Sequence, residues 1–330
     1  MLEFHKKGFD VQKIFKQAWE KIKNSDNIVL IAHINPDGDA LGSSLSLYPV
    51  LKKMGKKVSV FNVTKPLPMY LDFLPNFEKI VNKLPKKIDL MISFDCGSFD
   101  RFGIDERPSF LINIDHHISN TKYGDMNIID ANAASSSQVV YNMLKENQVK
   151  IDKNSALCIY TALVTDTGSF QYESVNEKVF LMAADLVSCG VKPEFVAKML
   201  FQRDRLSRLR LLAKAYDTIE LCCEGKVAFV EVTKEMMEIT GAIKDDTDTI
   251  VNSVRAIASV EVACMLREDD EGIKISLRSK NYADVSKVAV KYGGGGHIRA
   301  AGATIKDEFD FNKVKEMIKN DLNKSLKVKK

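Results

Sequence analysis

Three short apolar runs in the first half of the chain end in aspartate or histidine, and they constrain the fold more than any other feature. The runs cover Asn27–His33, Asp89–Asp95 and Phe110–Asp115. Each consists mainly of consecutive bulky residues without polar alternation, which is typical of a strand buried on both faces of a parallel sheet.

Amphipathic segments separate and follow these runs. Leu41–Met54 has a helical period and stops at Gly55, and Lys57–Asn62 is predicted as a further strand. Later helical patterns cover Ala134–Glu146, Ser155–Thr165 and Glu177–Ser188. Strands that alternate with helices predict an α/β fold with a mostly parallel sheet covered on both faces.

The pattern changes near residue 190, where two segments with helical spacing, 192–201 and 206–216, are separated by the polar stretch 202–205. We expect a first domain over residues 1–190, a helical connector over 191–215 and a smaller α/β domain over 216–330. Within the last of these, strands are predicted over 226–232, 260–267 and 273–279, and helices over 284–292 and 311–322.

Charge, cysteine usage and hydropathy restrict the partners and the compartment. The formal net charge of +4 is mild, whereas a long nucleic acid requires a dense basic stripe. The balance therefore favours a short anionic ligand over a long duplex.

Neither a signal peptide nor an apolar run long enough for a membrane span is found, and the six cysteines lack C-x-x-C or zinc-ribbon spacing. We expect a cytoplasmic protein without membrane contact.

Residues of the types that bind metals directly follow the three runs, and one more lies at the end of a later predicted helix. The candidate ligands are His33, Asp37, Asp39, Asp95, His116 and Asp166. The carboxyl ends of parallel strands form the ligand crevice of an open sheet, so these residues would meet at one edge. Carboxylates and imidazoles suit a hard-to-borderline divalent ion, with Mn²⁺ expected and Mg²⁺ as the alternative. Four carboxylates exceed the needs of one ion, which favours two metals sharing Asp95 as a bridge.

Each of these pieces, taken alone, has a simpler explanation. Asn35, Asp37 and Asp39 have the spacing of an EF-hand loop, but Ala40 replaces the loop glycine and Ser46 the closing glutamate. The same segment alone could be a turn, and a single histidine is more often structural. A structural zinc site would favour cysteine ligands. The joint occurrence of all the pieces at strand and helix ends favours the metal site.

Four segments, in this order, resemble the motifs of the DHH phosphoesterase family and span the first domain. They are His33–Gly42, Asp95–Ser98, Asp115–His117 and Thr165–Gly168. The resemblance implies two ligand sets: His33, Asp37 and Asp95 for one Mn²⁺, and Asp39, Asp95, His116 and Asp166 for the other. It further implies that His117 faces the substrate phosphate and that Asp115 supports the site by orienting an imidazole.

A glycine-rich segment in the second half provides the candidate substrate site. Consecutive glycines allow backbone N–H groups to converge on an anion, and His297 and Arg299 add side-chain donors. Four glycines alone would instead indicate a flexible linker. The segment is similar to the G-G-G-H motif of the DHH-associated domain, which in that family caps the metal site and binds substrate.

That similarity implies a substrate-binding set in the second domain. It comprises Arg278, Ser279, Gly294, Gly295, Gly296, His297 and Arg299. Arg278 on its own could equally be an exposed cation at a strand end.

The motif set most resembles the NrnA-type branch of the family, nano-RNases that degrade short oligoribonucleotides and dephosphorylate 3′-phosphoadenosine 5′-phosphate. The resemblance implies a manganese-dependent phosphoesterase in which the metals lower the pKa of the attacking water. Asp95, His117 and Arg299 would be the catalytic residues. The alternatives are a cyclic-dinucleotide or pApA phosphodiesterase, an inorganic pyrophosphatase and a non-catalytic nucleotide-binding module. Small nucleotides are the expected partners, and the oligomeric state stays open, with a homodimer as one alternative.

Overall fold

The structure, a computed structural model, describes residues 2–247 and 249–326. The chain divides into two compact units, Met1–Arg203 (unit 1) and Asp204–Lys330 (unit 2). The segment expected as a separate connector, 191–215, is divided between them. Its first helix packs into the core of unit 1 through Val196, whereas its second helix packs into unit 2 through Leu211.

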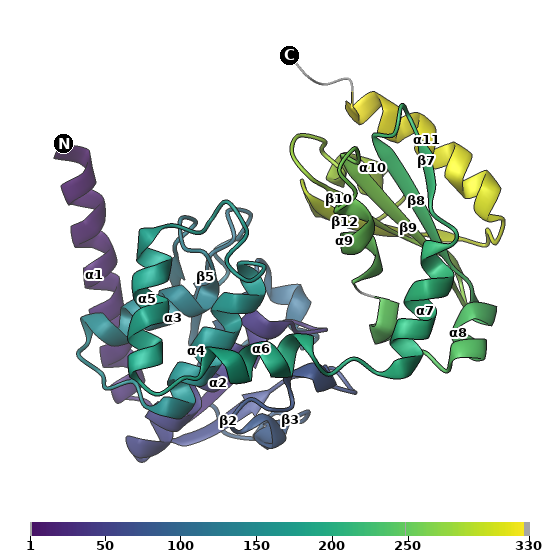
Figure 1. The fold of residues 1–330 in the computed structure, drawn as a ribbon. Helices are drawn as coiled ribbons and strands as arrows, with labels where there is room; N and C mark the ends of the chain where they lie inside the picture. The colour runs from purple at the N-terminus through teal and green to yellow at the C-terminus, as the bar shows by residue number, and fades with distance from the viewer. Residues whose placement is uncertain (1, 248, 327–330) are drawn as a thin grey trace. The chain divides into compact units, whose positions relative to one another are not determined.

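Unit 1 is built on one six-stranded sheet (Figure 1). Its elements are α1 (Leu2–Lys23), β1 (Asn27–Ala32), α2 (Gly38–Lys53), β2 (Lys57–Phe61), η1 (Met69–Leu71), η2 (Phe77–Lys79), β3 (Ile80–Val81), β4 (Leu90–Phe94), η3 (Phe99–Phe102), β5 (Leu111–Asp115), β6 (Met126–Ile129), α3 (Ser136–Glu146), α4 (Lys153–Asp166), α5 (Glu177–Ser188) and α6 (Pro193–Phe201). The strand order is β3-β2-β1-β4-β5-β6, and every neighbouring pair is parallel. The predicted parallel α/β sheet is confirmed.

The two faces of this sheet have different covers. Ile28 and Leu30 of β1 face a large core shared with helices α1 to α4, whereas Val29 and Ile31 face a smaller core. That second core is completed by η3 and loop residues such as Tyr123. The expectation that both faces are covered is correct. One cover consists of loops because the described connections from β4 to β5 and from β5 to β6 contain no α-helix.

The first helix is amphipathic. Phe15, Ala18, Trp19 and Ile22 of α1 recur at helical spacing and are buried in the core of unit 1. Its opposite face carries lysines, which accords with a helix that lies on the surface of the unit. None of the described helices is both long and apolar enough to cross a membrane.

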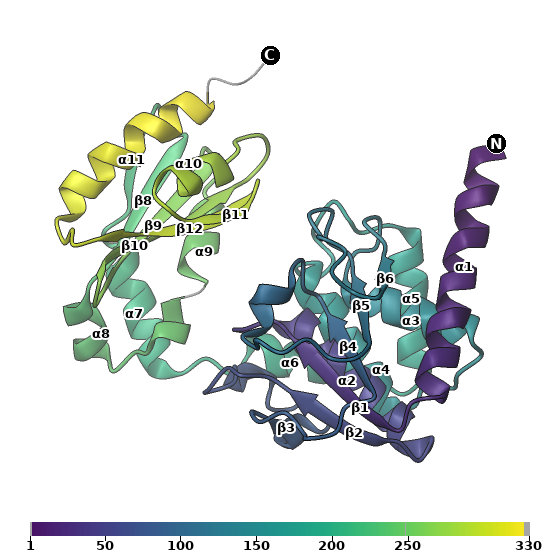
Figure 2. The same cartoon turned by 180° about the vertical axis from the view of Figure 1, so that it is seen from behind.

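Unit 2 contains a second six-stranded sheet (Figure 2). Its elements are α7 (Leu206–Tyr216), β7 (Glu220–Cys222), β8 (Val227–Val232), α8 (Lys234–Thr240), η4 (Lys244–Thr247), α9 (Ile250–Arg255), β9 (Val262–Asp269), β10 (Gly272–Ser279), α10 (Ser286–Lys291), β11 (Gly295–His297), β12 (Ala300–Lys306) and α11 (Phe311–Leu326). The order is β11-β12-β10-β9-β8-β7, with β8 and β9 parallel and the other pairs antiparallel.

Both faces of the second sheet carry helices. Val227 and Phe229 of β8 face the core formed with α10 and α11, and Ala228 and Val230 face the core formed with α7 and α9. This alternation follows from the two-residue period of a strand. The predicted smaller α/β domain is therefore present, and its sheet is mixed.

Candidate metal centre

Three adjacent parallel strands of unit 1 end at the same edge. His33 directly follows β1, Asp95 directly follows β4, and Asp115 is the last residue of β5. Because β1, β4 and β5 are neighbours in the sheet, these residues lie beside one another. Asp95 adopts a positive φ of 54°, which is uncommon for a residue other than glycine and recurs at functional sites.

Two glycines of α2 allow this helix to pack closely against α4. A Cβ atom at Gly42 would lie 2.6 Å from the carbonyl oxygen of Cys158, and one at Gly38 would collide with the side chain of Thr165. The start of α2 therefore lies against the end of α4. This contact places Asp39, in the first turn of α2, close to Asp166, the last residue of α4.

Asp37 combines a structural role with a place in the site. It is the N-cap of α2, and its Oδ1 accepts hydrogen bonds of 3.0 Å from the backbone N–H groups of Asp39 and Ala40. Its carboxylate also lies in one group with His33 and Asp95, whose ligand atoms are all within 4.8 Å of one another.

The structure brings the six predicted metal ligands together. One group of possible ligand atoms contains His33, Asp37 and Asp95, and a second contains Asp39, His116 and Asp166, each with all atoms within 4.8 Å. Asp95 joins the groups, because its Oδ2 lies 3.7 Å from Nε2 of His33 and its Oδ1 lies 3.5 Å from Nε2 of His116.

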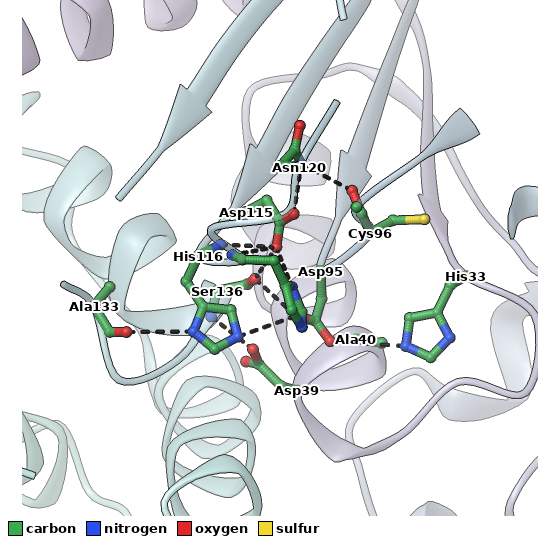
Figure 3. Close-up of polar contacts among 12 residues, drawn as sticks. His33, Asp39, Ala40, Asp95, Cys96, Asp115, His116, Asn120, Ala133 and Ser136 are labelled. Carbon is green, nitrogen blue, oxygen red and sulfur yellow. Dashed lines mark hydrogen bonds and ion pairs between the residues drawn. The ribbon is translucent and has the colours of Figure 1, made fainter. Parts of the chain in front are cut away.

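Both imidazoles are oriented by backbone carbonyl groups, as Figure 3 shows for His116. Nδ1 of His116 lies 3.3 Å from the carbonyl oxygen of Ala133, and Nδ1 of His33 lies 2.8 Å from that of Ile34. Each Nδ1–H can donate to its carbonyl, which leaves Nε2 as the ligand atom toward the carboxylates. Metal-binding histidines are usually held in this way.

Crowded negative charge dominates the electrostatics of the cluster. Burial, together with the charges of Asp95 and Asp166, raises the pKa of Asp39 well above its usual range. Burial also raises the pKa of Asp166 to about 7, and the nearby charge of Asp95 adds to this effect. Asp37 is more exposed than the other candidate ligands, but desolvation by the surrounding protein and the charge of Asp95 still raise its pKa. Like charges that are held together raise the cost of ionisation in this way.

Two further members of the cluster have pKa values that favour their charged forms. Burial lowers the pKa of His116, but the hydrogen bond and charge of Asp95 and the charge of Asp166 outweigh it and raise the value to about 10. Burial likewise opposes ionisation of Asp95, yet its bonds with His116 and His33 hold its pKa below the usual range. Protons thus compensate part of the negative charge in the metal-free protein.

The donor set fits divalent cations. Carboxylate oxygens and imidazole nitrogens are the ligands that Mn²⁺ and Mg²⁺ sites use, whereas thiolates favour softer ions. The nearby Cys96 is buried, and its Sγ lies 3.1 Å from the carbonyl oxygen of Ser98, to which it can donate. Cations in the two groups would neutralise carboxylates that otherwise repel one another.

A polar network next to the cluster fixes the orientation of His117. Oδ1 of Asp115 accepts from Nδ1 of His117 at 2.7 Å and from its backbone N–H at 3.2 Å. Oδ2 of Asp115 accepts from Nδ2 of Asn120 at 2.5 Å, and the same amide group donates to the carbonyl oxygen of Cys96 at 3.0 Å (Figure 3). Asp115 therefore orients the imidazole of His117, as the family resemblance implied, and Asn120 fixes Asp115 through a hydrogen bond.

The sequence did not single out Ser43, Ser136 or Asn120. Ser43 donates to Asp39 at 3.0 Å, and Ser136 donates its hydroxyl to Asp95 at 3.0 Å. A run of serines directly before a helical pattern is an N-cap signal, which could have indicated that the start of α3 offers donors. No comparable local signal marked Asn120.

The predicted substrate-binding residues of unit 2 also lie together. Arg278 pairs with Ala300 across β10 and β12, and the backbone N–H of Ser279 donates to the carbonyl oxygen of Arg299 at 3.0 Å. The guanidinium of Arg299 donates to the carbonyl oxygen of Ala283 at 3.0 Å. Ser279 is buried, whereas His297 and Arg299 are exposed. The two binding segments expected from the resemblance therefore form one end of the second sheet.

The glycine-rich segment forms a hairpin, which excludes the flexible-linker interpretation. Gly295–His297 pairs with β12, and a Cβ atom at Gly294 would collide with the carbonyl oxygen of Gly302. The N–H of Gly294 donates to Ala289 at the end of α10, so it already has a partner within the fold. A Cβ atom at Gly295 would meet open space, and Gly296 has a φ of 140° that favours glycine.

The chain is similar to known proteins over both units. Residues 27–163 match the model of the DHH family, N-terminal domain, and residues 226–324 match the DHHA1 domain. The bifunctional oligoribonuclease and PAP phosphatase NrnA of Thermus thermophilus is 33% identical over 90% of this chain and 91% of that protein. The Bacillus subtilis protein of the same name is 29% identical over 85% and 90%.

A solved structure agrees with these relatives. The exopolyphosphatase-related protein from Bacteroides fragilis superposes with a TM-score of 0.87 and 28% identity, over 95% of this chain and 96% of that one. The similarity thus extends across the two units rather than over the first alone.

Proposed function

The chain belongs to the DHH phosphoesterase family, and from this premise we propose that it hydrolyses short oligoribonucleotides and 3′-phosphoadenosine 5′-phosphate with two divalent cations, Mn²⁺ being the expected metal. The names of its relatives in Thermus thermophilus and Bacillus subtilis state both activities. We place the enzyme in the cytoplasm and its substrates among small nucleotides.

The position of Asp95 carries the two-metal proposal. Each of its carboxylate oxygens faces a different imidazole, His33 at 3.7 Å and His116 at 3.5 Å. A carboxylate placed in this way can bridge two cations, with Asp37 completing one ligand set and Asp39 and Asp166 the other. Bound cations would act as Lewis acids that lower the pKa of water and neutralise charge on the phosphoryl group.

The chain's own residues would bind and orient the phosphate. The bond from His117 to Asp115, 2.7 Å long, fixes the ring, so that Nε2 is the atom expected to donate to a phosphoryl oxygen. From unit 2 we propose Arg299 and His297 as phosphate-binding side chains, with Arg278, Ser279 and the hairpin glycines Gly294, Gly295 and Gly296 lining the same end of the sheet. Charge-assisted bonds of this kind are the strong ones.

A panel of substrates tests the proposal. Chelator-stripped protein is assayed with and without Mn²⁺ on 3′-phosphoadenosine 5′-phosphate, end-labelled dinucleotides, cyclic di-AMP, pApA and pyrophosphate. We expect Mn²⁺-dependent hydrolysis that is fastest on the first two. Faster turnover of cyclic di-AMP or pApA would assign the cyclic-dinucleotide alternative, and pyrophosphate as the best substrate would assign the pyrophosphatase.

A length series tests the substrate class separately. The net charge of +4 is small, so few counterions would be released on binding and salt should have a modest effect. We expect rates on 5′-labelled oligonucleotides to fall with increasing length and to change little between two salt concentrations. Rates that rise with length and collapse in high salt would instead indicate a processive exonuclease. The homodimer stays a prediction that analytical ultracentrifugation would test.

A further inference from the structure

The first turn of α3 reaches two of the candidate metal ligands. Ser136 is the first residue of this helix, and its hydroxyl donates to Oδ1 of Asp95 at 3.0 Å. Its backbone N–H donates to Oδ2 of Asp39 at 2.6 Å, and the N–H of Ser137 donates to Oδ1 of Asp39 at 3.0 Å. Figure 3 shows Ser136 beside Asp95 and Asp39.

The hydroxyl of Ser136 lies closer to Oδ1 of Asp95, at 3.0 Å, than to Oδ1 of Asp115, at 3.5 Å. In Asp95, Oδ1 lies 3.5 Å from Nε2 of His116 and 3.5 Å from Nδ1 of His117, which is bonded to Asp115 at 2.7 Å, whereas Oδ2 faces His33. A carboxylate oxygen has about two lone-pair sites. A donor on Oδ1 therefore occupies one site and directs the other toward the group formed by Asp39, His116 and Asp166.

Burial makes this hydrogen bond effective. Ser136 is 0% exposed and Asp95 is 4% exposed, so water competes little for either atom. Hydrogen bonds to charged groups are stronger than those between neutral groups. The amino end of a helix adds a favourable field for the two carboxylates.

We propose that Ser136 is a positioning residue, which holds the bridging carboxylate of Asp95 so that the cation on the His116 side binds tightly. The inference rests on the proposed two-metal function and adds a residue outside the ligand set. Residues that support ligands in this way typically change metal affinity by about 10–100-fold when they are replaced.

Metal binding to the full-length chain tests the proposal without relying on activity. Mn²⁺ affinity and stoichiometry are measured by calorimetry, and the magnetic coupling between two ions is followed by electron paramagnetic resonance. In Ser136→Ala we expect one of the two ions to bind about 10–100-fold more weakly. At subsaturating Mn²⁺ the coupled signal should then give way to that of an isolated ion.

The chain offers a matched control one residue away. Ser137 is equally buried, but its hydroxyl contacts Ser135 at 2.6 Å and its bond to Asp39 comes from the backbone. Ser137→Ala should therefore bind both ions like the wild type, and Ser136→Thr, which keeps a hydroxyl, should restore the coupled signal. If Ser136→Ala does not fold, Ser136→Cys, which keeps the side-chain volume but is only a weak donor, is measured in its place.

The possible results separate the proposal from its premise. Wild-type affinity for both ions in Ser136→Ala would overturn the positioning role while leaving the two-metal centre intact. An equal loss in Ser137→Ala would assign the effect to packing of α3 and overturn the role as well. A wild-type protein that never binds two ions would overturn the proposed function, and the role of Ser136 with it.

Discussion

Asp39 of unit 1 and Glu261 of unit 2 are both buried carboxylates, but their pKa values shift in opposite directions. In unit 1, burial and the charges of Asp95 and Asp166 raise the pKa of Asp39. In unit 2, Glu261 is 3% exposed and accepts hydrogen bonds from the backbone N–H groups of residues 281–283 and from the amide side chain of Asn281. Burial opposes its ionisation, yet these bonds lower its pKa.

This difference distinguishes a structural charge from a functional one. Glu261 has donors within its own unit, so its buried charge is compensated when the chain folds. The carboxylates of unit 1 have donors as well, but they also repel one another, and protons shared with His116 compensate only part of that repulsion. Clusters with such perturbed pKa values occur mainly at functional sites, and divalent cations are the natural compensation here.

The largest effect is expected at the shared ligand. Asp95→Ala removes a carboxylate from both ligand groups, so activity should fall by more than the roughly 10–100-fold typical of a supporting residue. Steady-state rates on a dinucleotide, with Mn²⁺ content measured in parallel, check this. Asp105→Ala, which changes an exposed aspartate of unit 1 outside the cluster, is the control. Near-normal activity in Asp95→Ala would contradict the shared-ligand account.

Replacing a proposed phosphate-binding residue of unit 2 should reduce activity by a smaller factor and leave the bound metal unchanged. Arg299→Ala removes a charge-assisted bond worth roughly 1.5–3 kcal/mol, which corresponds to about one to two decades in kcat/KM. Metal content should match the wild type. Arg210→Ala changes another exposed arginine of unit 2, on α7, and should keep wild-type kinetics. Unchanged kinetics in Arg299→Ala would remove this residue from the substrate site.

Stability should change with opposite sign in the two units. In chelator, Asp166→Asn removes a carboxylate whose ionisation is opposed by burial and by the charge of Asp95, more than the charge of His116 favours it, and should raise the melting temperature of unit 1. In Mn²⁺ the same change should lower the melting temperature because a ligand is lost. Glu261→Gln removes the charge that its donors stabilise and should cost roughly 1–3 kcal/mol with or without metal. Thermal unfolding is measured in both buffers. Destabilisation by Asp166→Asn in chelator would contradict the argument that burial and the charge of Asp95 oppose ionisation of Asp166.

The smallest effect is a pH dependence of the metal-free protein. A carboxyl group with a raised pKa in the folded state stabilises the fold at low pH, and this contribution is lost as pH rises through the folded value. For Asp166 that value is about 7, so unit 1 in chelator should become less stable between pH 6 and pH 8, and His116, whose pKa is raised to about 10, should add to the loss in the same direction. The change should be on the order of 1 kcal/mol, or about 2–4 °C.

Unit 2 provides the comparison for this titration. The lowered pKa of Glu261 contributes stability that is present above its ordinary value of 4.5 and is lost only in more acidic solution. Its melting temperature should therefore change little between pH 6 and pH 8. Saturating Mn²⁺ should abolish the slope of unit 1, and a slope that persists with Mn²⁺ would assign it to groups outside the cluster.

The sequence predicted the strand ends because their signals are local. A buried apolar run followed at once by aspartate or histidine marks both the strand and the side chain at its end, as with Asp95. Short-range periodicity likewise identified α2 and α4. The packing of these helices could not be predicted in the same way, since it depends on Gly38 and Gly42 meeting residues of a distant segment.

Contacts between distant segments account for what the sequence left undetermined. The bond from Ser136 to Asp95 joins residues 41 positions apart, and no local pattern contains it. The antiparallel pairing in unit 2 and the hairpin at Gly295–His297 also depend on which strands meet. The division at Arg203 rather than near residue 190 arises because α6 shares the core of unit 1.

Titration of metal-stripped protein with Mn²⁺, with bound metal and dinucleotide hydrolysis followed in the same sample, tests the central claim most directly. The account requires that the carboxylates of unit 1 form a two-cation centre on which hydrolysis depends. It predicts no activity in chelator, two bound ions per chain at saturation, and full activity only when the second site fills. Full activity in chelator, or saturation of activity by a single ion per chain, would contradict it.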